Sequence, residues 1–192
     1  SEEWAFISPD YYRNFYEAVA YLIESGYRRI LYAKTAYNTF DMRVREQAYR
    51  DAHKHAAVKI DESLIYRKPL KELDNPESAE LFLDDVLPHR PDALIIGNPT
   101  AIHYCIRSLR RRGLNVPEDI AIIGMDDWKM ADAQTPSIST IDNNYLQIAH
   151  EAIDYFKKHI LEASQEKIQK FIPGKLIIRE SSPRRSVDMK NI

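Results

Sequence analysis

The chain has 192 residues, which is enough for one large domain or two small ones with an ample core. Its 44% hydrophobic and 29% charged residues are ordinary for a soluble globular protein, and a net charge of -2 excludes a general electrostatic footprint for nucleic acid. The single cysteine, Cys105, excludes an intrachain disulfide, and neither a signal peptide nor a long apolar span is present in the chain. We therefore expect a soluble, cytoplasmic protein with no membrane partner.

Predicted strands and helices alternate through almost the whole chain. Short apolar runs predict buried strands, and apolar residues spaced three and four apart predict amphipathic helices. The expected strands are Trp4–Ile7, Arg29–Ala33, Ser63–Arg67, Ala93–Gly97, Ile120–Gly124 and Leu176–Arg179. The expected helices are Pro9–Ser25, Asp41–His55, Asn75–Val86, Pro99–Arg112 and Asn144–Ala163, the first of them capped by Ser8 and ended by Gly26. This alternation is typical of an α/β domain with a doubly wound parallel sheet.

The most informative stretch is VPEDIAIIGMDD, residues 116–127. It predicts a tight turn and a fully buried strand, with Gly124, Asp126 and Asp127 at the strand's carboxyl end. Open parallel sheets bind ligands in the crevice just beyond the carboxyl ends of their strands. A carboxylate in that position accepts hydrogen bonds from adjacent hydroxyls, which is what the recognition of a sugar requires.

Three segments resemble, in their order and spacing, the effector-binding domain of LacI/GalR-type transcriptional regulators. They are VPEDIAIIGMDD, the strand-plus-Asn element Ile95–Asn98, and Pro136–Ile141, which matches Pro-x-(Leu/Ile)-(Ser/Thr)-Thr-(Ile/Val). The resemblance begins near Phe6 and continues to about Ser182. It implies a periplasmic-binding-protein-like type I fold, in which three crossovers join two α/β lobes.

The resemblance also implies how the chain divides. Residues 28–141 and 171–182 correspond to the C-terminal lobe, residues 1–27 and 142–170 to remnants of the N-terminal lobe, and residues 183–192 to a flexible tail. Nothing in the chain resembles the family's helix-turn-helix or the first strands of its N-terminal lobe. We therefore expect a fragment of a longer regulator that contacts DNA only through a missing head, either a helix-turn-helix or the winged head of hybrid GntR-type regulators.

The resemblance assigns ligand contacts first to Asp126 and Arg45. Asp126 matches the first Asp of the family's Gly-(Phe/Tyr)-Asp-Asp and is expected to accept hydrogen bonds from effector hydroxyls, whereas Asp127 is expected to form a helix cap or strand-end salt bridge. Arg45 matches the Arg of the family's Arg-x-x-Gly-(Phe/Trp), and its planar guanidinium suits sugar oxygens or a phosphate. Ala48 stands where the family often has Gly, and a surface arginine of a charged helix is the alternative for Arg45.

Asn98, Asn143 and Tyr145 complete the expected ligand site. Asn98 matches the Asn of the family's Ala-Asn-Asp, although an Asn before Pro99 is also an excellent helix N-cap, and Pro99 replaces the usual Asp. Asn143 and Tyr145 match positions on the third crossover that often line the cleft, with Asn143 where a Gln is common. Tyr145 can stack on the apolar face of a sugar ring or pack in the core.

Other conspicuous residues favour structural roles. Trp128 and Tyr37 are expected to pack as large aromatics, and Arg13, at a cleft-facing position, matches no residue type of the family. The arginines near the end of helix Pro99–Arg112 complement its dipole better than they indicate nucleic-acid binding. The six histidines show no metal-ligand spacing, and no catalytic triad or nucleotide loop is recognisable, so no metal, cofactor or catalytic residue is expected.

The leading hypothesis is therefore the effector-sensing and dimerisation domain of a LacI/GalR-type regulator. A small molecule, a sugar or sugar derivative, would bind between the lobes, and their closure would shift a homodimer between DNA-competent and incompetent states. The resemblance places the dimer interface on Pro99–Arg112 and Trp128–Gln134, with Tyr104 and Leu109 as apolar contacts. The alternative is the sugar-binding protein of a membrane transporter, which shares the two-lobe fold, and an enzyme is disfavoured.

Overall fold

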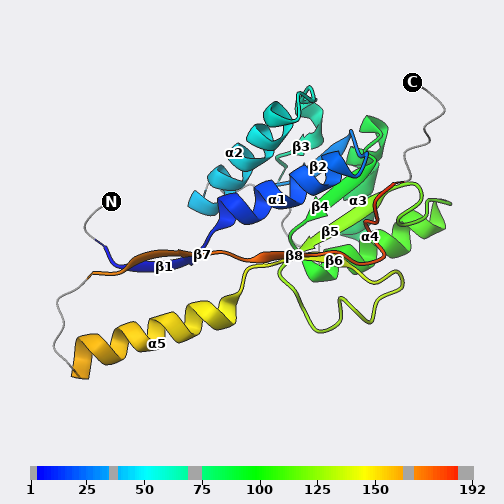
Figure 1. Ribbon diagram of the computed structural model, residues 1–192. Helices are drawn as coiled ribbons and strands as arrows, with labels where there is room; N and C mark the ends of the chain where they lie inside the picture. Colours follow the sequence, from blue (N-terminus) through cyan, green and yellow to red (C-terminus); the bar gives the residue numbers. More distant parts are fainter. Residues whose placement is uncertain (1–3, 35–38, 69–74, 162–166, 186–192) are drawn as a thin grey trace.

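The structure, a computed structural model, describes residues 4–34, 39–68, 75–161 and 167–185, and these form two bodies of unequal size (Figure 1). The larger body is built on a six-stranded sheet, and the smaller one consists of two strands and one helix. Tyr37, which was predicted to pack, lies outside the described residues. No helix in the described part of the chain is both long enough and apolar enough to cross a membrane.

The sheet of the larger body has the strand order β3-β2-β4-β5-β6-β8. Its strands are β2 (Ile30–Ala33), β3 (Ile65–Tyr66), β4 (Ala93–Ile96), β5 (Ala121–Met125), β6 (Ser139–Asp142) and β8 (Lys175–Ile177). The first five strands in this order are parallel, and β8 runs antiparallel to β6 at the edge. The parallel pairing predicted for the first four is confirmed, and β6 is a strand that was not predicted.

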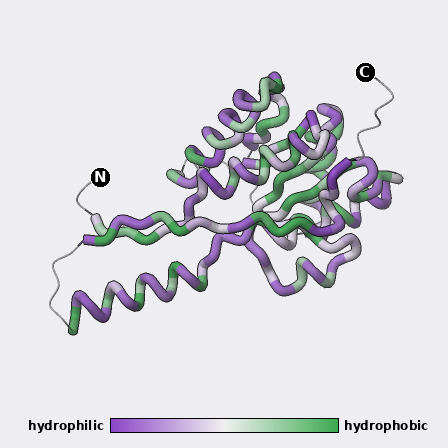
Figure 2. Tube along the Cα trace, in the orientation of Figure 1, coloured by the Kyte–Doolittle hydropathy of each residue, from purple (hydrophilic) through white to green (hydrophobic). Residues whose placement is uncertain are grey.

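Helices cover both faces of this sheet. They are α1 (Tyr11–Glu24), α2 (Phe40–His55), α3 (Pro76–Val86) and α4 (Pro99–Arg111). Alternate residues of each strand face opposite sides, so Ala93 and Ile95 of β4 pack with α1 and α2, while Leu94 and Ile96 pack with α3 and α4. The central strands β2, β4 and β5 are accordingly the most uniformly apolar part of the sheet (Figure 2). Cys105 lies on the buried face of α4, and burial raises the pKa of its thiol to about 12.

The smaller body contains the parallel pair β1 (Phe6–Pro9) and β7 (Gln169–Ile172) together with α5 (Tyr145–Leu161). It extends away from the larger body, with α5 running alongside the β1–β7 pair (Figure 1). A single helix on two strands buries little, and no residue of α5 is buried. Its large exposed apolar side chains are Tyr145, Leu146, Ile153, Phe156, Ile160 and Leu161.

The first helix differs from its prediction in two ways. Asp10 caps α1 by accepting a hydrogen bond from the backbone N–H of Arg13 at 3.0 Å, because Ser8 and Pro9 continue β1. In addition, α1 packs on the six-stranded sheet and not in the smaller lobe to which residues 1–27 were assigned. The apolar stripe of the helix predicts burial, but it does not identify the sheet that covers it.

The segment after β8 is fixed to the larger body as far as residue 185. The hydroxyl of Tyr27 donates to the carbonyl of Pro183 at 2.9 Å. The guanidinium of Arg185 lies 4.3 Å from the centre of the Tyr27 ring and 3.5 Å from a carboxylate oxygen of Asp92. Pro183 and Arg185 of the predicted tail are therefore in contact with the larger body, and residues 186–192 lie outside the described part of the chain.

Candidate ligand-binding site

Asp126 directly follows β5 and has a constrained backbone. Its φ of 62° lies in the left-handed region, which residues other than glycine rarely adopt. The backbone N–H of Asp126 donates to the carbonyl of Ile141 at 2.8 Å, so the residue stays tied to β6. Its carboxylate accepts a hydrogen bond from Nδ2 of Asn143 at 2.6 Å. Strained residues cluster at functional sites, and this one holds a carboxylate at a carboxyl strand end.

Tyr145 and Tyr11 connect this carboxylate to Arg45. The pKa of Tyr145 is raised by burial and by the neighbouring Asp126 and Tyr11 side chains, although half of Tyr145 is exposed. Arg45 lies with its guanidinium 4.6 Å from the centre of the Tyr11 ring and 3.1 Å from a carboxylate oxygen of Asp41. Only 7% of Arg45 is exposed, so the alternative of a solvated surface arginine does not describe it.

Asn98 caps α4 and also lies level with Asp126. Its side-chain oxygen accepts from the backbone N–H of Thr100 at 2.8 Å and of Ala101 at 3.3 Å. Ile96 of β4 is paired with Gly124 of β5, so Asn98 and Asp126 each stand two residues beyond the same rung of the sheet. Asn98 is exposed, and one amide can fill both of the roles considered for it.

Two residues behind this site were not predicted from the sequence. Asn14 of α1 and Gly174, which follows β7, continue the hydrogen bonding that starts at Asp126 and Asn143. Only 3% of Asn14 is exposed. The sequence did contain one sign of the role of Asn14. This residue lies one and two turns before Ala18 and Leu22 on the buried face of α1, where an amide requires polar partners.

Arg179, beyond β8, fixes the loop that follows the site. Its guanidinium lies 3.0 Å from Asp127 and donates to Ile138 O at 2.7 Å and to Thr140 Oγ1 at 3.0 Å. The hydroxyl of Thr140 in turn donates to Asp127 at 2.7 Å. The salt bridge expected of Asp127 is confirmed, and this carboxylate is occupied by the protein itself.

Two weaker candidates have structural positions. Trp128 packs so closely on Gly124 that a Cβ added there would lie 2.9 Å from the indole ring. It therefore belongs to the core, as expected for a large aromatic. Arg13 pairs with Glu17 at 2.8 Å on the surface of α1, with 58% of its side chain exposed.

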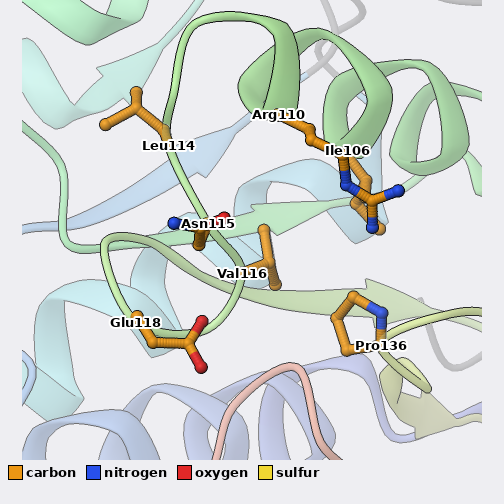
Figure 3. A pocket seen from close by; sticks show the side chains of 7 residues that line it. All are labelled: Ile106, Arg110, Leu114, Asn115, Val116, Glu118 and Pro136. Carbon is orange, nitrogen blue, oxygen red and sulfur yellow. The ribbon is translucent and has the colours of Figure 1, made fainter.

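A separate hollow lies at the amino ends of β5 and β6, away from Asp126. It has a volume of about 330 Å³, and Figure 3 shows its lining residues, Ile106, Arg110, Leu114, Asn115, Val116, Glu118 and Pro136. A neighbouring hollow of about 250 Å³ shares Ile106 and Arg110 and continues along α4 to Gln134. The first hollow therefore borders α4 alone, whereas the second borders both segments predicted to form a dimer interface. Leu109, on the sheet-facing side of α4, is fully buried, so its predicted contact with a partner is wrong.

Comparison with known proteins identifies a matching family and relatives that are named as regulators. Residues 19–182 match the family described as periplasmic binding protein-like domain. The NTD biosynthesis operon regulator NtdR of Bacillus subtilis is 28% identical over 95% of this chain and 55% of its own length. The ribose operon repressor of Escherichia coli is 29% identical over 79% of this chain and 46% of its own length. The chain thus spans about half the length of these curated relatives.

Solved structures agree. A sugar-binding transcriptional regulator of the LacI family from Escherichia coli, in complex with phosphate, has a TM-score of 0.77 at 25% identity and matches 91% of this chain and 63% of its own. The family match covers most of the chain and extends from α1 past β8. The chain belongs to the periplasmic binding protein-like domain family, and the resemblance of its sequence to the effector-binding domain of LacI-type transcriptional regulators is confirmed.

Proposed function

We propose that this domain binds a sugar or sugar derivative in front of Asp126 and controls DNA binding by a segment outside these residues. The observation that carries the proposal is a carboxylate with a constrained backbone at the carboxyl end of β5, beside an amide and a half-exposed tyrosine. Such a group offers acceptors to adjacent hydroxyls, while the ring of Tyr145 can cover an apolar sugar face. Relatives named as regulators favour cytoplasmic gene control over transport and over catalysis.

The connection between the two bodies explains how binding would be transmitted. Asn143 and Tyr145 lie where the chain leaves β6 for α5, whereas Asp126 and Arg45 belong to the larger body. A ligand held by both sets would favour one angle between the bodies, and it would shift the population by its difference in affinity for the two angles. Asn98 would add a donor or acceptor from the end of β4.

We further propose that the domain acts as a homodimer through α4 and residues 128–134. The two hollows along α4 make this face concave in two places, where side chains of a partner can fit. Met130 is 57% exposed there and supplies an adaptable apolar contact.

Replacing Asp126 by Ala tests the ligand proposal. Loss of a hydrogen bond to a charged group costs about 1.5–3 kcal/mol, so affinity should fall about ten- to more than hundredfold. The measurement is calorimetric titration of the whole gene product with a panel of sugars that starts with D-ribose. Asp154→Ala, which removes an exposed carboxylate from α5, is the matched control and should bind as the wild type does. Equal affinity of Asp126→Ala and wild type for the same sugar would remove Asp126 from the site.

A further inference from the structure

A one-way chain of hydrogen bonds passes from the backbone into the candidate site. The N–H of Gly174 donates to Oδ1 of Asn14 at 2.8 Å. Nδ2 of Asn14 donates to Oδ1 of Asn143 at 3.0 Å, and Nδ2 of Asn143 donates to Oδ1 of Asp126 at 2.6 Å. These four residues come from α1, from the end of β5, from the β6–α5 connection and from the β7–β8 connection.

The direction of this relay follows from its first member. A backbone N–H can only donate, so it fixes which end of the Asn14 amide is the acceptor. The amino group of Asn14 must then face Asn143 and meet that residue's oxygen. Asn143 is thereby oriented with its own amino group toward Asp126, where a carboxylate can only accept.

Burial makes the relay hard to replace with water. Asn14 is 3% exposed and Asn143 is 1% exposed. A buried polar group that loses its partner carries the full desolvation penalty, so a reversed amide at either position is strongly disfavoured. Glycine is also required at the start, because a Cβ at Gly174 would lie 2.1 Å from the carbonyl oxygen of Asp142 and 2.6 Å from the amide nitrogen of Asn14.

We propose that Asn14 is a positioning residue for the ligand. It fixes the orientation of the Asn143 amide, which donates a hydrogen bond to one oxygen of Asp126 and offsets part of the negative charge on that oxygen. The remaining lone pairs of the carboxylate then point toward the ligand. Asn14 stands on the larger body while its two partners lie on the connections to the smaller one. A change in the angle between the bodies therefore acts on the same hydrogen bonds that orient Asp126. The part of this proposal that concerns the ligand rests on the proposed function, whereas the direction of the relay does not.

The decisive variant is Asn14→Asp, which has nearly the same shape. Its carboxylate still accepts from the N–H of Gly174, but it cannot donate to Asn143. At pH 7 the Asn143 amide then lies between two carboxylates, and in either orientation its oxygen faces one of them. Asn75→Asp is the control for the added charge, because Asn75 is exposed and caps α3 through a side-chain oxygen that a carboxylate retains.

Nuclear magnetic resonance tests the direction without a ligand. In Asn14→Asp at pH 7, the carboxamide signals of Asn143 should shift while the Gly174 amide stays protected from hydrogen exchange. In Asn14→Leu, which removes the acceptor, exchange of the Gly174 amide should be at least about tenfold faster. Unchanged Asn143 signals in a folded Asn14→Asp protein would overturn the relay. If that variant does not fold, Asn14→Ser serves in its place, because its hydroxyl is too short to reach Gly174 and exchange there should again accelerate.

Titration with D-ribose and the other sugars of the panel tests the effect on the ligand. At pH 7 the affinity of Asn14→Asp should be at least about tenfold below that of the wild type, which corresponds to about 1.4 kcal/mol. The loss of affinity should shrink as the new carboxyl is protonated at lower pH. Its O–H then donates to Oδ1 of Asn143 and restores the hydrogen bond that the wild-type Asn14 makes. A purely structural role would give no such recovery. Normal affinity in Asn14→Asp would refute the positioning role and leave the proposed function standing, whereas a wild type that binds no sugar would refute both.

Discussion

At the scale of single residues, the candidate site consists of groups already engaged by the protein. Asp126 is bonded by Asn143, and Arg45 is stacked on Tyr11 and paired with Asp41. Such contacts hold side chains in place before a ligand arrives, which reduces the ordering cost of binding. Asp127, next in the chain, is instead tied to Arg179, so the two adjacent carboxylates have different roles.

Replacing Arg45 by Lys should separate the shape of this side chain from its charge. Lysine retains the positive charge but loses the planar group that lies on Tyr11, so the free energy of unfolding should fall by about 1 kcal/mol. Urea unfolding measures it. Arg13→Lys changes an exposed arginine in the same way and should leave stability within about 0.5 kcal/mol of the wild type. Equal stability of Arg45→Lys and wild type would show that the stacking contributes nothing.

At the scale of elements, a network of ion pairs joins α2 to the ends of β2 and β3. The carboxylate of Glu46 on α2 lies 2.8 Å from Nζ of Lys34 and 2.9 Å from guanidinium nitrogens of both Arg50 and Arg67. Burial acts to raise the pKa of Glu46, but the hydrogen bonds from these three cations outweigh it and lower the pKa to about 2. The ion pairs thus add side-chain contacts to the backbone pairing that joins the short edge strand β3 to β2.

This network should make stability depend on acid pH. Because the pKa of Glu46 in the folded state lies below its ordinary value of 4.5, its contribution is complete above pH 4.5 and is lost as the pH falls toward 2. Glu46→Gln should therefore be less stable than the wild type by about 2–3 kcal/mol at pH 7, and the difference should shrink at pH 3. Urea unfolding at several pH values measures it, with Glu24→Gln as an exposed control. A difference that does not change with pH would contradict the assignment.

The elements also show what the sequence could predict. The runs that form β2, β4 and β5 are continuously apolar, so these strands and their parallel pairing were predictable. The four helices of the larger body were predictable from the spacing of their apolar residues. Strand β6 was not, because its buried Ser139 and Thr140 look polar. Their hydroxyls are satisfied by Ser182, Arg179 and Asp127, residues distant in the chain.

The candidate site was predictable to a similar degree. Asp126, Asn143 and Tyr145 follow from the resemblance, and the structure brings them together. Asn14 could not be assigned, since its partner Asn143 lies 129 positions away and only the folded connections bring the two amides together. Local pattern reveals that a polar group is buried, but the partner is a property of the tertiary fold.

At the scale of the whole molecule, two exposed surfaces are candidates for self-association. The face along α4 is the proposed dimer interface, and the exposed apolar side of α5 is the other. Large exposed apolar patches commonly mediate contacts, so the two must be separated experimentally.

Analytical ultracentrifugation at about 10 μM should show a dimer that Met130→Glu converts to a monomer, because the substitution places a charge in the core of the interface. Leu81→Glu introduces the same charge on α3, where the side chain is 61% exposed, and should leave the dimer intact. A dimer that is lost only in Phe156→Glu would assign association to α5 and contradict the proposed interface.

Because Cys105 is buried, the folded chain exposes no reactive thiol. The chain has no other cysteine, and a thiol that is buried and rarely ionised at neutral pH does not react with maleimides in the folded protein. Cysteines introduced at Arg13 on the larger body and at Lys157 on α5, both exposed, would be the only thiols open to spin labels. Dipolar spectroscopy could then follow the hinge angle as a distribution of distances, with the native core left unaltered.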